Sequence, residues 1–253
     1  MLAATASVWG STILAVLAVS AIAFAGIVVL VVQEDLLRRI VPVLVSFAVG
    51  ALLGDALFHI LPELAVDGGI TEGLSWVMAL SILFFFVLEK FIHLHHQLNA
   101  PEHRHVHPVV LTNLLGDGVH NFVDGAIIAG SFLVSPSLGL ATTIAVALHE
   151  IPQEMGDLGV LVHAGLAPKR ALAYNVASAM TALLGAVIAL LLDGAIDGIE
   201  RLLLAISAGA FIYIAGSDLI PELHKGTSIR TSVLQFLGIA AGFAVMAALL
   251  AIE

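Results

Sequence analysis

Histidine and carboxylate side chains recur at helical spacing in two neighbouring stretches of this sequence. In the first stretch, His120 is followed four residues later by Asp124, and in the second His149 is followed four residues later by Gln153. Residues four apart share one face of an α-helix, so each pair can direct two ligand atoms at one ion. Imidazole, carboxylate and amide groups supply nitrogen and oxygen ligands, which suit Zn²⁺, Fe²⁺ or Mn²⁺. The two stretches therefore predict a four-ligand metal site between facing helices.

Further polar residues flank this predicted site. Asn121, Glu150 and Glu154 lie beside the four ligands, where they could bind a second ion or support the first one. A buried polar network that only joins helices is the alternative, but contacts of that kind usually employ Ser, Thr or Asn rather than several acids. Two facing helices that both carry histidine and carboxylate therefore favour metal binding. Further polar residues of the same two stretches are expected to line a route that leads out of the site; they are Asn113, Asp117, Glu154 and Asp157.

The rest of the chain is strongly apolar. Of its 253 residues, 60% are hydrophobic and 11% are charged, and the mean hydropathy is +1.09. A soluble domain is about 45–50% apolar and about 25% charged, so this composition excludes a soluble globular enzyme and a disordered chain. Nine basic residues against nineteen acidic ones exclude a nucleic-acid partner. Because cysteine is absent, disulfides and thiolate metal sites are excluded too. We expect an all-α integral membrane protein.

Eight apolar segments are long enough to cross a bilayer, which takes roughly 20 residues per helix. Residues 1–30 contain no Lys or Arg, so we expect a retained first helix and not a cleaved signal peptide. With the N-terminus outside, eight of the nine basic residues fall at cytoplasmic ends, which predicts a multi-pass protein of the cell membrane with both termini extracytoplasmic. Residues 1–253 then form a single transmembrane domain, whose state as monomer or homodimer stays open. The expected segments are 10–32, 40–62, 73–94, 109–133, 139–163, 171–192, 201–220 and 231–252.

Two of these segments contain an internal repeat. Residues 50–64 align without a gap with residues 209–223, with Gly, Ala, Pro, Glu and Leu at matching positions. The first copy ends a helix that runs outward and the second ends one that runs inward. This indicates an inverted repeat of helices 1–3 and 6–8 around helices 4 and 5, unless Pro-Glu simply ends two apolar helices. Inverted repeats are typical of transporters, whose sites lie near the midplane. The residues of this repeat that could line the pathway are Asp55, His59 and Asp218.

A predicted cytoplasmic loop at residues 95–108 is rich in histidine. Six histidines fall within residues 93–107. Short His-rich tracts are typical of metal binding, so this loop could receive the imported ion. The alternative is a polar loop whose histidines are incidental.

The two polar stretches resemble motifs of the ZIP (Zrt/Irt-like) metal transporters. His120-Asn-Phe-Val-Asp124-Gly125 resembles the helix 4 motif of that family, and residues 149–157 resemble its helix 5 motif HExPHExGD. Residues 54–63 and 213–222 resemble the helix 2 and helix 7 signatures of one ZIP subfamily. The resemblance implies eight helices in a 3+2+3 arrangement, a binuclear metal centre between helices 4 and 5, and uptake of Zn²⁺ or a related divalent ion.

The resemblance also implies ligands for each metal, with two departures in this chain. Gln153 stands where the subfamily often has a second histidine, and glutamine is a neutral, weaker ligand. In some relatives a glutamate of helix 6 binds the second metal, and the matching position here is Thr181. The family pattern places one metal on His120, Asp124, His149 and Gln153, and the other on Asn121 and Glu150.

Two other functions fit parts of the pattern. An intramembrane hydrolase would use His149-Glu150 as the start of HExxH, but the residue four after His149 is Gln153 and not histidine. A haem protein with His120 and His149 as axial ligands would place acids beside an apolar macrocycle. We therefore predict a transporter and not an enzyme. Its expected substrate is Zn²⁺, with Cd²⁺, Fe²⁺ or Mn²⁺ as alternatives, and its expected partners besides the metal ion are the lipid bilayer and, in a homodimer, a second copy of the chain.

Overall fold

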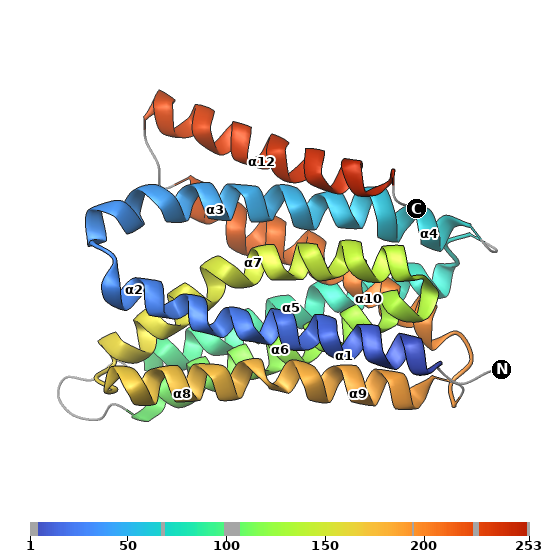
Figure 1. Ribbon diagram of the computed structural model, residues 1–253, viewed down its shortest axis with the longest axis horizontal. Coiled ribbons are helices and arrows are strands. Elements are labelled where there is room, and N and C mark those ends of the chain that lie inside the picture. Colours follow the sequence, from blue (N-terminus) through green and yellow to red (C-terminus); the bar gives the residue numbers. More distant parts are fainter. Residues whose placement is uncertain (1–4, 67–68, 99–106, 194, 225–227, 252–253) are drawn as a thin grey trace.

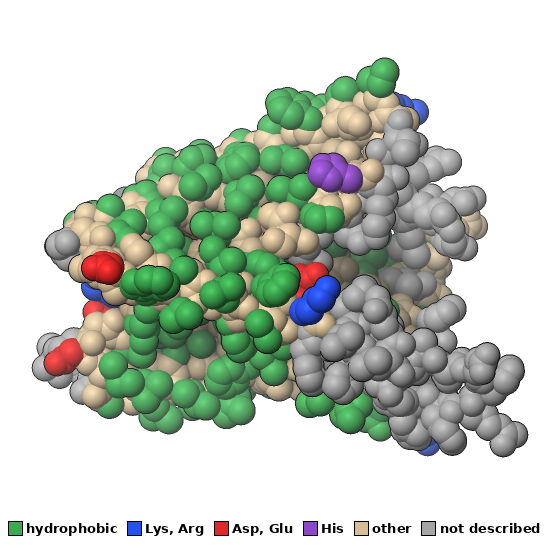
Figure 2. All heavy atoms as spheres, turned by 180° about the vertical axis from the view of Figure 1, so that it is seen from behind, with side chains coloured by type: hydrophobic (Ala, Val, Ile, Leu, Met, Phe, Trp, Pro, Cys, Tyr) green, Lys and Arg blue, Asp and Glu red, His purple; other side chains and the backbone are tan. Residues whose placement is uncertain are grey.

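The computed structural model is an all-helical bundle. It describes residues 5–66, 69–98, 107–193, 195–224 and 228–251, and no strand occurs among them. Six helical segments within this part are long and apolar enough to cross a membrane. Hydrophobic side chains predominate on the coloured part of the face seen in Figure 2, where two acidic side chains lie at one end and an acidic and a basic one lie together near the middle. The expected all-α integral membrane fold is confirmed at this level.

The helices that precede the polar stretches form three long rods. In the first two rods, short 3₁₀ or π segments continue the helix without a turn between them. The third rod extends the helix predicted for residues 73–94. The bounds are α1 (Ala6–Ser20), η1 (Ala21–Gly26) and α2 (Ile27–Val31); α3 (Glu34–Asp55), η2 (Ala56–Ile60) and α4 (Leu61–Ala65); and α5 (Glu72–Leu98).

The predicted His-rich loop is shorter than expected. Because α5 continues to Leu98 and α6 begins at His107, residues 95–98 and 107–108 are helical. The run from His95 to Leu98 contains neither Gly nor Pro, so nothing local ends the helix there. The middle of the predicted loop, 99–106, lies outside the described residues.

The polar stretches lie on a helical hairpin, and more rods follow it. Only Ser135 separates α6 (His107–Val134) from α7 (Pro136–His163), and α7 continues through Pro152. These two helices are not among the six apolar segments, because they carry the polar and charged side chains. The later bounds are α8 (Pro168–Ala179) and α9 (Thr181–Leu192); α10 (Ile199–Tyr213), η3 (Ile214–Leu219) and α11 (Ile220–Leu223); and α12 (Ile229–Leu249).

The two copies of the repeat share one backbone irregularity. The π-helical segment η2 precedes Pro62, and the π-helical segment η3 precedes Pro221 at the matching position. A proline inside a helix lacks an N–H and crowds the carbonyl four residues earlier. A wider π turn relieves that crowding, and such turns are frequent at functional sites. The repeat seen in the sequence is therefore matched by its local structure.

Packing between rods brings distant segments together. In Figure 1, α12 lies along α3 at the top of the bundle, and α9, which packs against α6, runs along the bottom. The approach of α6 to α9 depends on two glycines, because a Cβ on Gly125 would collide with Ala182 and one on Gly185 with the carbonyl of Phe122. Small residues allow this close approach between membrane helices. The start of α1 and the end of α12 lie at the same end of the bundle.

Candidate metal centre

The hairpin of α6 and α7 places the two predicted motifs side by side, at nearly equal distances from the turn that joins the helices. Ser135 caps α7 by accepting a hydrogen bond from Leu138 N (3.1 Å), and Pro136 occupies the first turn. His120 lies fifteen residues before Ser135, and His149 lies fourteen residues after it. With a rise of about 1.5 Å per residue, both histidines lie roughly 21–22 Å from the turn. The length of the two helix arms therefore places the histidines opposite each other.

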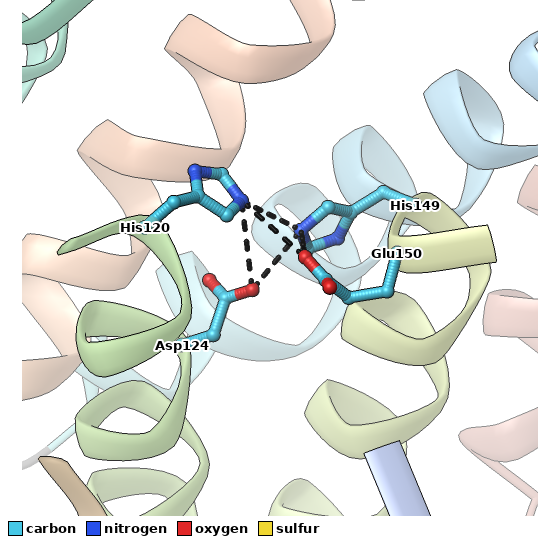
Figure 3. Close-up of side chains that lie close together, drawn as sticks. All are labelled: His120, Asp124, His149 and Glu150. Atoms are coloured by element: carbon cyan, nitrogen blue, oxygen red, sulfur yellow. Dashed lines mark hydrogen bonds and ion pairs between the residues drawn. The ribbon is translucent and has the colours of Figure 1, made fainter. Parts of the chain in front are cut away.

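Four side chains converge between these helices. Figure 3 shows His120 and Asp124 from α6 pointing at His149 and Glu150 from α7. The Nε2 atoms of the two histidines are 3.2 Å apart. Asp124 Oδ2 lies 3.2 Å from His149 Nε2 and 3.6 Å from His120 Nε2. Glu150 Oε1 lies 3.5 Å and 3.6 Å from the same two nitrogens.

These spacings outline a site of the size of a zinc ion. Five of the six edges between these four atoms measure 3.2–3.6 Å, and the sixth, between the two carboxylates, is at most 4.8 Å. The edge of a regular tetrahedron is ~1.63 times the distance from its centre to a corner, so the five shorter edges correspond to an ion about 2.0–2.2 Å from each ligand atom. Zinc bonds to imidazole nitrogen are about 2.0–2.1 Å long, and those to carboxylate oxygen are about 2.0–2.2 Å long. The four atoms can therefore bind one Zn²⁺ with little movement.

Surrounding contacts orient the ligands of this centre. The Nδ1–H of His149 donates to the carbonyl oxygen of Ala145 (3.3 Å), which leaves the Nε2 lone pair directed at the centre. Phe85 packs edge-on against the His120 ring, and Phe211 does the same against His149. The side chain of His120 is 11% exposed, whereas those of the other three ligands are 1% exposed. Two carboxylates in so buried a place favour a cation between them.

The structure assembles three of the four predicted ligands and adds a different fourth. His120, Asp124 and His149 lie together as the spacing indicates. The fourth corner is Glu150, which the motif placed beside this group. Its longer side chain reaches back from the neighbouring face of α7. Gln153 lies instead along a cavity that it shares with His120.

That cavity has a volume of about 310 Å³ and extends from the centre away from the Ser135 turn. Asn113 and Asp157, which line it, are joined by a hydrogen bond from Asn113 Nδ2 to Asp157 Oδ1 (3.1 Å). Glu89 and Tyr213 also line the cavity, and sequence reasoning did not identify them. The Tyr213 hydroxyl donates a hydrogen bond to Glu89 Oε2 (2.5 Å). The only local signal was an acidic residue at the end of an apolar helix.

Two of the predicted pathway residues lie on the other side of the centre. The Thr142 hydroxyl, seven residues before His149, donates to the buried carboxylate of Asp55 (3.0 Å). His59 is buried against α12, with Nε2 3.0 Å from the carbonyl oxygen of Met246. The side chain of the third predicted residue, Asp218, lies outside the described residues.

Three other predicted residues lie on the side of the hairpin that faces α8. Asn121 Nδ2 donates to Asp117 Oδ1 (2.8 Å). Glu154 accepts a hydrogen bond from Asn175 of α8, and Asp117 accepts one from Ser178 of the same helix. All of these side chains are buried. They form a second polar group beside the four-ligand centre.

A family comparison covers the hairpin and the helices that follow it. The family model for the ZIP zinc transporters matches residues 101–250. The chain belongs to the ZIP zinc transporter family. The matched region contains all four residues of the centre, so the resemblance of the helix 4 and helix 5 motifs to ZIP proteins is confirmed.

Individual ZIP proteins are similar to this chain over different lengths. Zinc transporter ZIP13 of Pongo abelii is 36% identical over 219 residues, which are 80% of this chain and 65% of that protein. Zinc transporter ZIP4 of Mus musculus is 42% identical over 142 residues, which are 55% of this chain and 21% of that protein. Zinc transporter ZIP10 of Mus musculus is 39% identical over 142 residues, which are 53% of this chain and 17% of that protein. The chain therefore spans less than two thirds of each of these ZIP proteins.

Proposed function

We propose that this chain transports a divalent metal ion across the membrane, with Zn²⁺ as its substrate. The observation that carries the proposal is the buried group of two imidazoles and two carboxylates at zinc-like spacing, connected to a cavity. Family membership supports the same function, because the ZIP relatives are named zinc transporters. A transported ion must bind and leave again, and the cavity provides the route for leaving.

We propose that the cavity faces the cytoplasm. Eight spans lie in the cell membrane in a 3+2+3 arrangement, with both termini extracytoplasmic. The first three spans (α1–α2, α3–α4 and α5) and the last three (α8–α9, α10–α11 and α12) surround the central pair of α6 and α7. On that topology the Ser135 turn is outside, and the cavity wall formed by Asn113, Asp117 and Asp157 is inside. Asp55 and His59, on the outer side of the centre, are buried. In this conformation an ion bound at the centre therefore leaves through the cavity, toward the cytoplasm. The positive residues at the expected cytoplasmic ends support this orientation.

We infer that metal binding extends beyond the four converging atoms. Gln153 lies beside His120 along the cavity, where its amide oxygen can receive the ion on the way out. Asn121 and Glu154 lie beside the centre and supply oxygen ligands for a second ion. Cd²⁺, Fe²⁺ and Mn²⁺ accept the same nitrogen and oxygen ligands, so they are competing substrates. We propose that a single chain is the transporting unit. In a homodimer, each of the two chains would then transport metal through its own centre.

A hydrolase fits this geometry less well. A catalytic zinc keeps three protein ligands and one open position for water. Here Glu150, the residue that would act as the general base, is itself one of four converging ligands. A closed set of four ligands favours capture and release of the ion over activation of water.

Uptake of radioactive zinc into proteoliposomes tests the proposed function. The purified chain should carry Zn²⁺ into the vesicles, and His120→Ala should reduce that uptake to the level of empty vesicles. His224→Ala is the matched control, because this histidine is exposed and lies outside the centre. Competition by Cd²⁺, Fe²⁺ and Mn²⁺ ranks the substrates. If His120→Ala transports Zn²⁺ as the unmodified chain does, the proposal is wrong.

A further inference from the structure

A groove on the outside of the bundle lies between α6 and the rod formed by α8 and α9. Its volume is about 330 Å³. Residues between 114 and 122 of α6 line one side of the groove, and Ser178, Thr181 and Leu184 line the other. Leu115, Val119 and Leu184, which line the groove, are 37–59% exposed, so it opens away from the core. The groove shares no lining residue with the cavity that begins at His120.

The groove exists because α6 and α9 separate on one side of their closest contact. At Gly125 and Gly185 the two helices meet so closely that an added Cβ would collide with the backbone of the other helix. Seven residues before Gly125, an added Cβ on Gly118 would meet nothing closer than Thr181 Cγ2 (3.7 Å) and Ser178 Cβ (3.9 Å), which is ordinary contact. The missing side chain of Gly118 therefore leaves an open space between the helices.

The groove lies at a depth where hydrocarbon surrounds the protein. Gly118 follows the first residue of α6 by eleven residues and precedes its last by sixteen, which are roughly 16 Å and 24 Å along the axis. The hydrocarbon core of a bilayer is about 30 Å thick, so a core centred on α6 includes the whole groove. The other wall belongs to Pro168–Leu192, a segment apolar enough to cross a membrane. What fills the groove therefore comes from the interior of the bilayer.

The chemistry of the groove favours an apolar occupant. Among the described residues that line it, none carries a charge. Both of its hydroxyl groups donate within the protein, Ser178 to the carboxylate of Asp117 and Thr181 to the carbonyl oxygen of Gly118 (2.5 Å). A polar ligand would lose hydrogen bonds here without compensation. A hydrocarbon chain would instead gain the van der Waals contacts that an empty groove forfeits.

From these observations, we propose that the groove binds one acyl chain of a bilayer phospholipid, and that the bound chain supports the wall of the ion cavity. Ser178, which lines the groove, donates a hydrogen bond to Asp117, which lines the cavity. A chain packed on Gly118 and Ser178 presses on this hydrogen bond from outside and holds α8 against α6. The binding of the chain is independent of the proposed function, whereas its effect on transport rests on that function.

Photolabelling tests whether an acyl chain occupies the groove. The full chain is reconstituted in vesicles whose phosphatidylcholine carries a diazirine near the middle of one acyl chain, and mass spectrometry locates the adducts after illumination. The comparison surface is the exposed apolar face of α5, where Leu83, Phe84, Phe86 and Val87 are 47–60% exposed. We expect residues 114–122 and 178–184 to be labelled about fivefold more often than this face, because a groove contacts the chain on more than one side.

Gly118→Leu tests whether the groove itself binds the chain. The new side chain fills the open space, so labelling of the groove should fall about fivefold, to the level of α5. Gly118→Ala adds only a methyl group in ordinary contact and should keep most of the labelling. Gly10→Leu is the matched control, because a Cβ on this glycine of α1 would meet nothing within 4 Å. If Gly118→Leu does not fold, as judged by size-exclusion chromatography, Leu184→Trp blocks the groove from its exposed edge and decides the test.

Zinc uptake tests whether the bound chain supports the cavity wall. Methyl-branched acyl chains are wider than straight ones and should not enter the groove. The unmodified chain should therefore take up Zn²⁺ at least about twofold more slowly in vesicles of branched phosphatidylcholine than in vesicles of the straight-chain lipid. Gly118→Leu should take up Zn²⁺ at the same rate in both, because leucine replaces the acyl chain. This variant separates an effect of the groove from an effect of the bulk bilayer.

The proposal is overturned if the groove is labelled no more often than α5, or if Gly118→Leu leaves its labelling unchanged. Equal uptake by the unmodified chain in both kinds of vesicle overturns the support of the cavity wall. If the groove is labelled but the chain takes up no zinc in any vesicle, the proposed function fails and the acyl-chain site stands.

Discussion

Shortening Glu150 tests whether this residue completes the metal centre. Its Oε1 atom lies 3.5–3.6 Å from the two histidine nitrogens, which places it about 2.0–2.2 Å from an ion held by all four ligands. Glu150→Asp removes one methylene and withdraws the carboxylate by up to about 1.5 Å. The oxygen then lies roughly 3.5 Å from the ion, beyond bonding distance, while the negative charge is kept.

The expected loss can be bounded from below. Removing a partner that only orients a metal ligand costs about 10–100-fold in metal affinity. Losing the ligand itself should therefore raise the Kd for Zn²⁺ at least about 100-fold, which is about 2.7 kcal/mol. The measurement is competition between the purified protein and a fluorescent zinc chelator. Glu150→Gln keeps the length and one oxygen and should have an intermediate effect.

Gln153→Ala is the matched comparison, because Gln153 stands at the position that the sequence motif assigns to the first metal. It lies along the cavity, so we expect its removal to raise the Kd less than about tenfold. If Gln153→Ala weakens zinc binding more than Glu150→Asp does, then Gln153 is the fourth ligand and the geometric reasoning is refuted.

Two further predictions concern packing and the cavity. Gly185→Ala should lower the free energy of unfolding by about 1–3 kcal/mol, because the new methyl group would collide with Phe122, and thermal unfolding should detect this. Gly156→Ala, in which the added methyl group would enter open space, is the control, and equal stability of both variants would contradict the packing argument. Tyr213→Phe removes the hydrogen bond to Glu89 at the cavity and should lower zinc uptake about two- to tenfold, with Zn²⁺ affinity unchanged. A change in affinity without a change in uptake rate would place Tyr213 at the centre instead.

Local patterns in the sequence predict much of this structure. The apolar segments predict the helices to within several residues, as with 109–133 against α6 and 139–163 against α7. The pairing of His120 with Asp124 follows from the pitch of one helix, and the hairpin follows from the short polar turn at residues 135–137. These features depend on residues that are close in the sequence. Composition and spacing therefore suffice to predict them.

The motif predicts where along α6 and α7 the candidate metal centre lies, but it does not predict that Glu150 is the fourth converging side chain. Glu150 and Gln153 lie on adjacent faces of α7, and which of them reaches the ion depends on how α7 is rotated against α6. Helical pitch alone does not fix that rotation, which depends on packing against other helices, such as that of Phe85 on His120 and of Phe211 on His149.

By itself, the sequence determined the membrane setting, the helical hairpin and three of the four side chains that converge at the candidate metal centre. Only the tertiary structure brought Asn175 and Ser178 of α8 to Glu154 and Asp117, and Tyr213 of α10 to Glu89 of α5. The physical reason is the separation along the chain. Glu89 and Tyr213 are 124 residues apart, and no local propensity records which helices become neighbours. Helix formation is local, whereas the neighbours of each helix are selected by packing of the whole bundle.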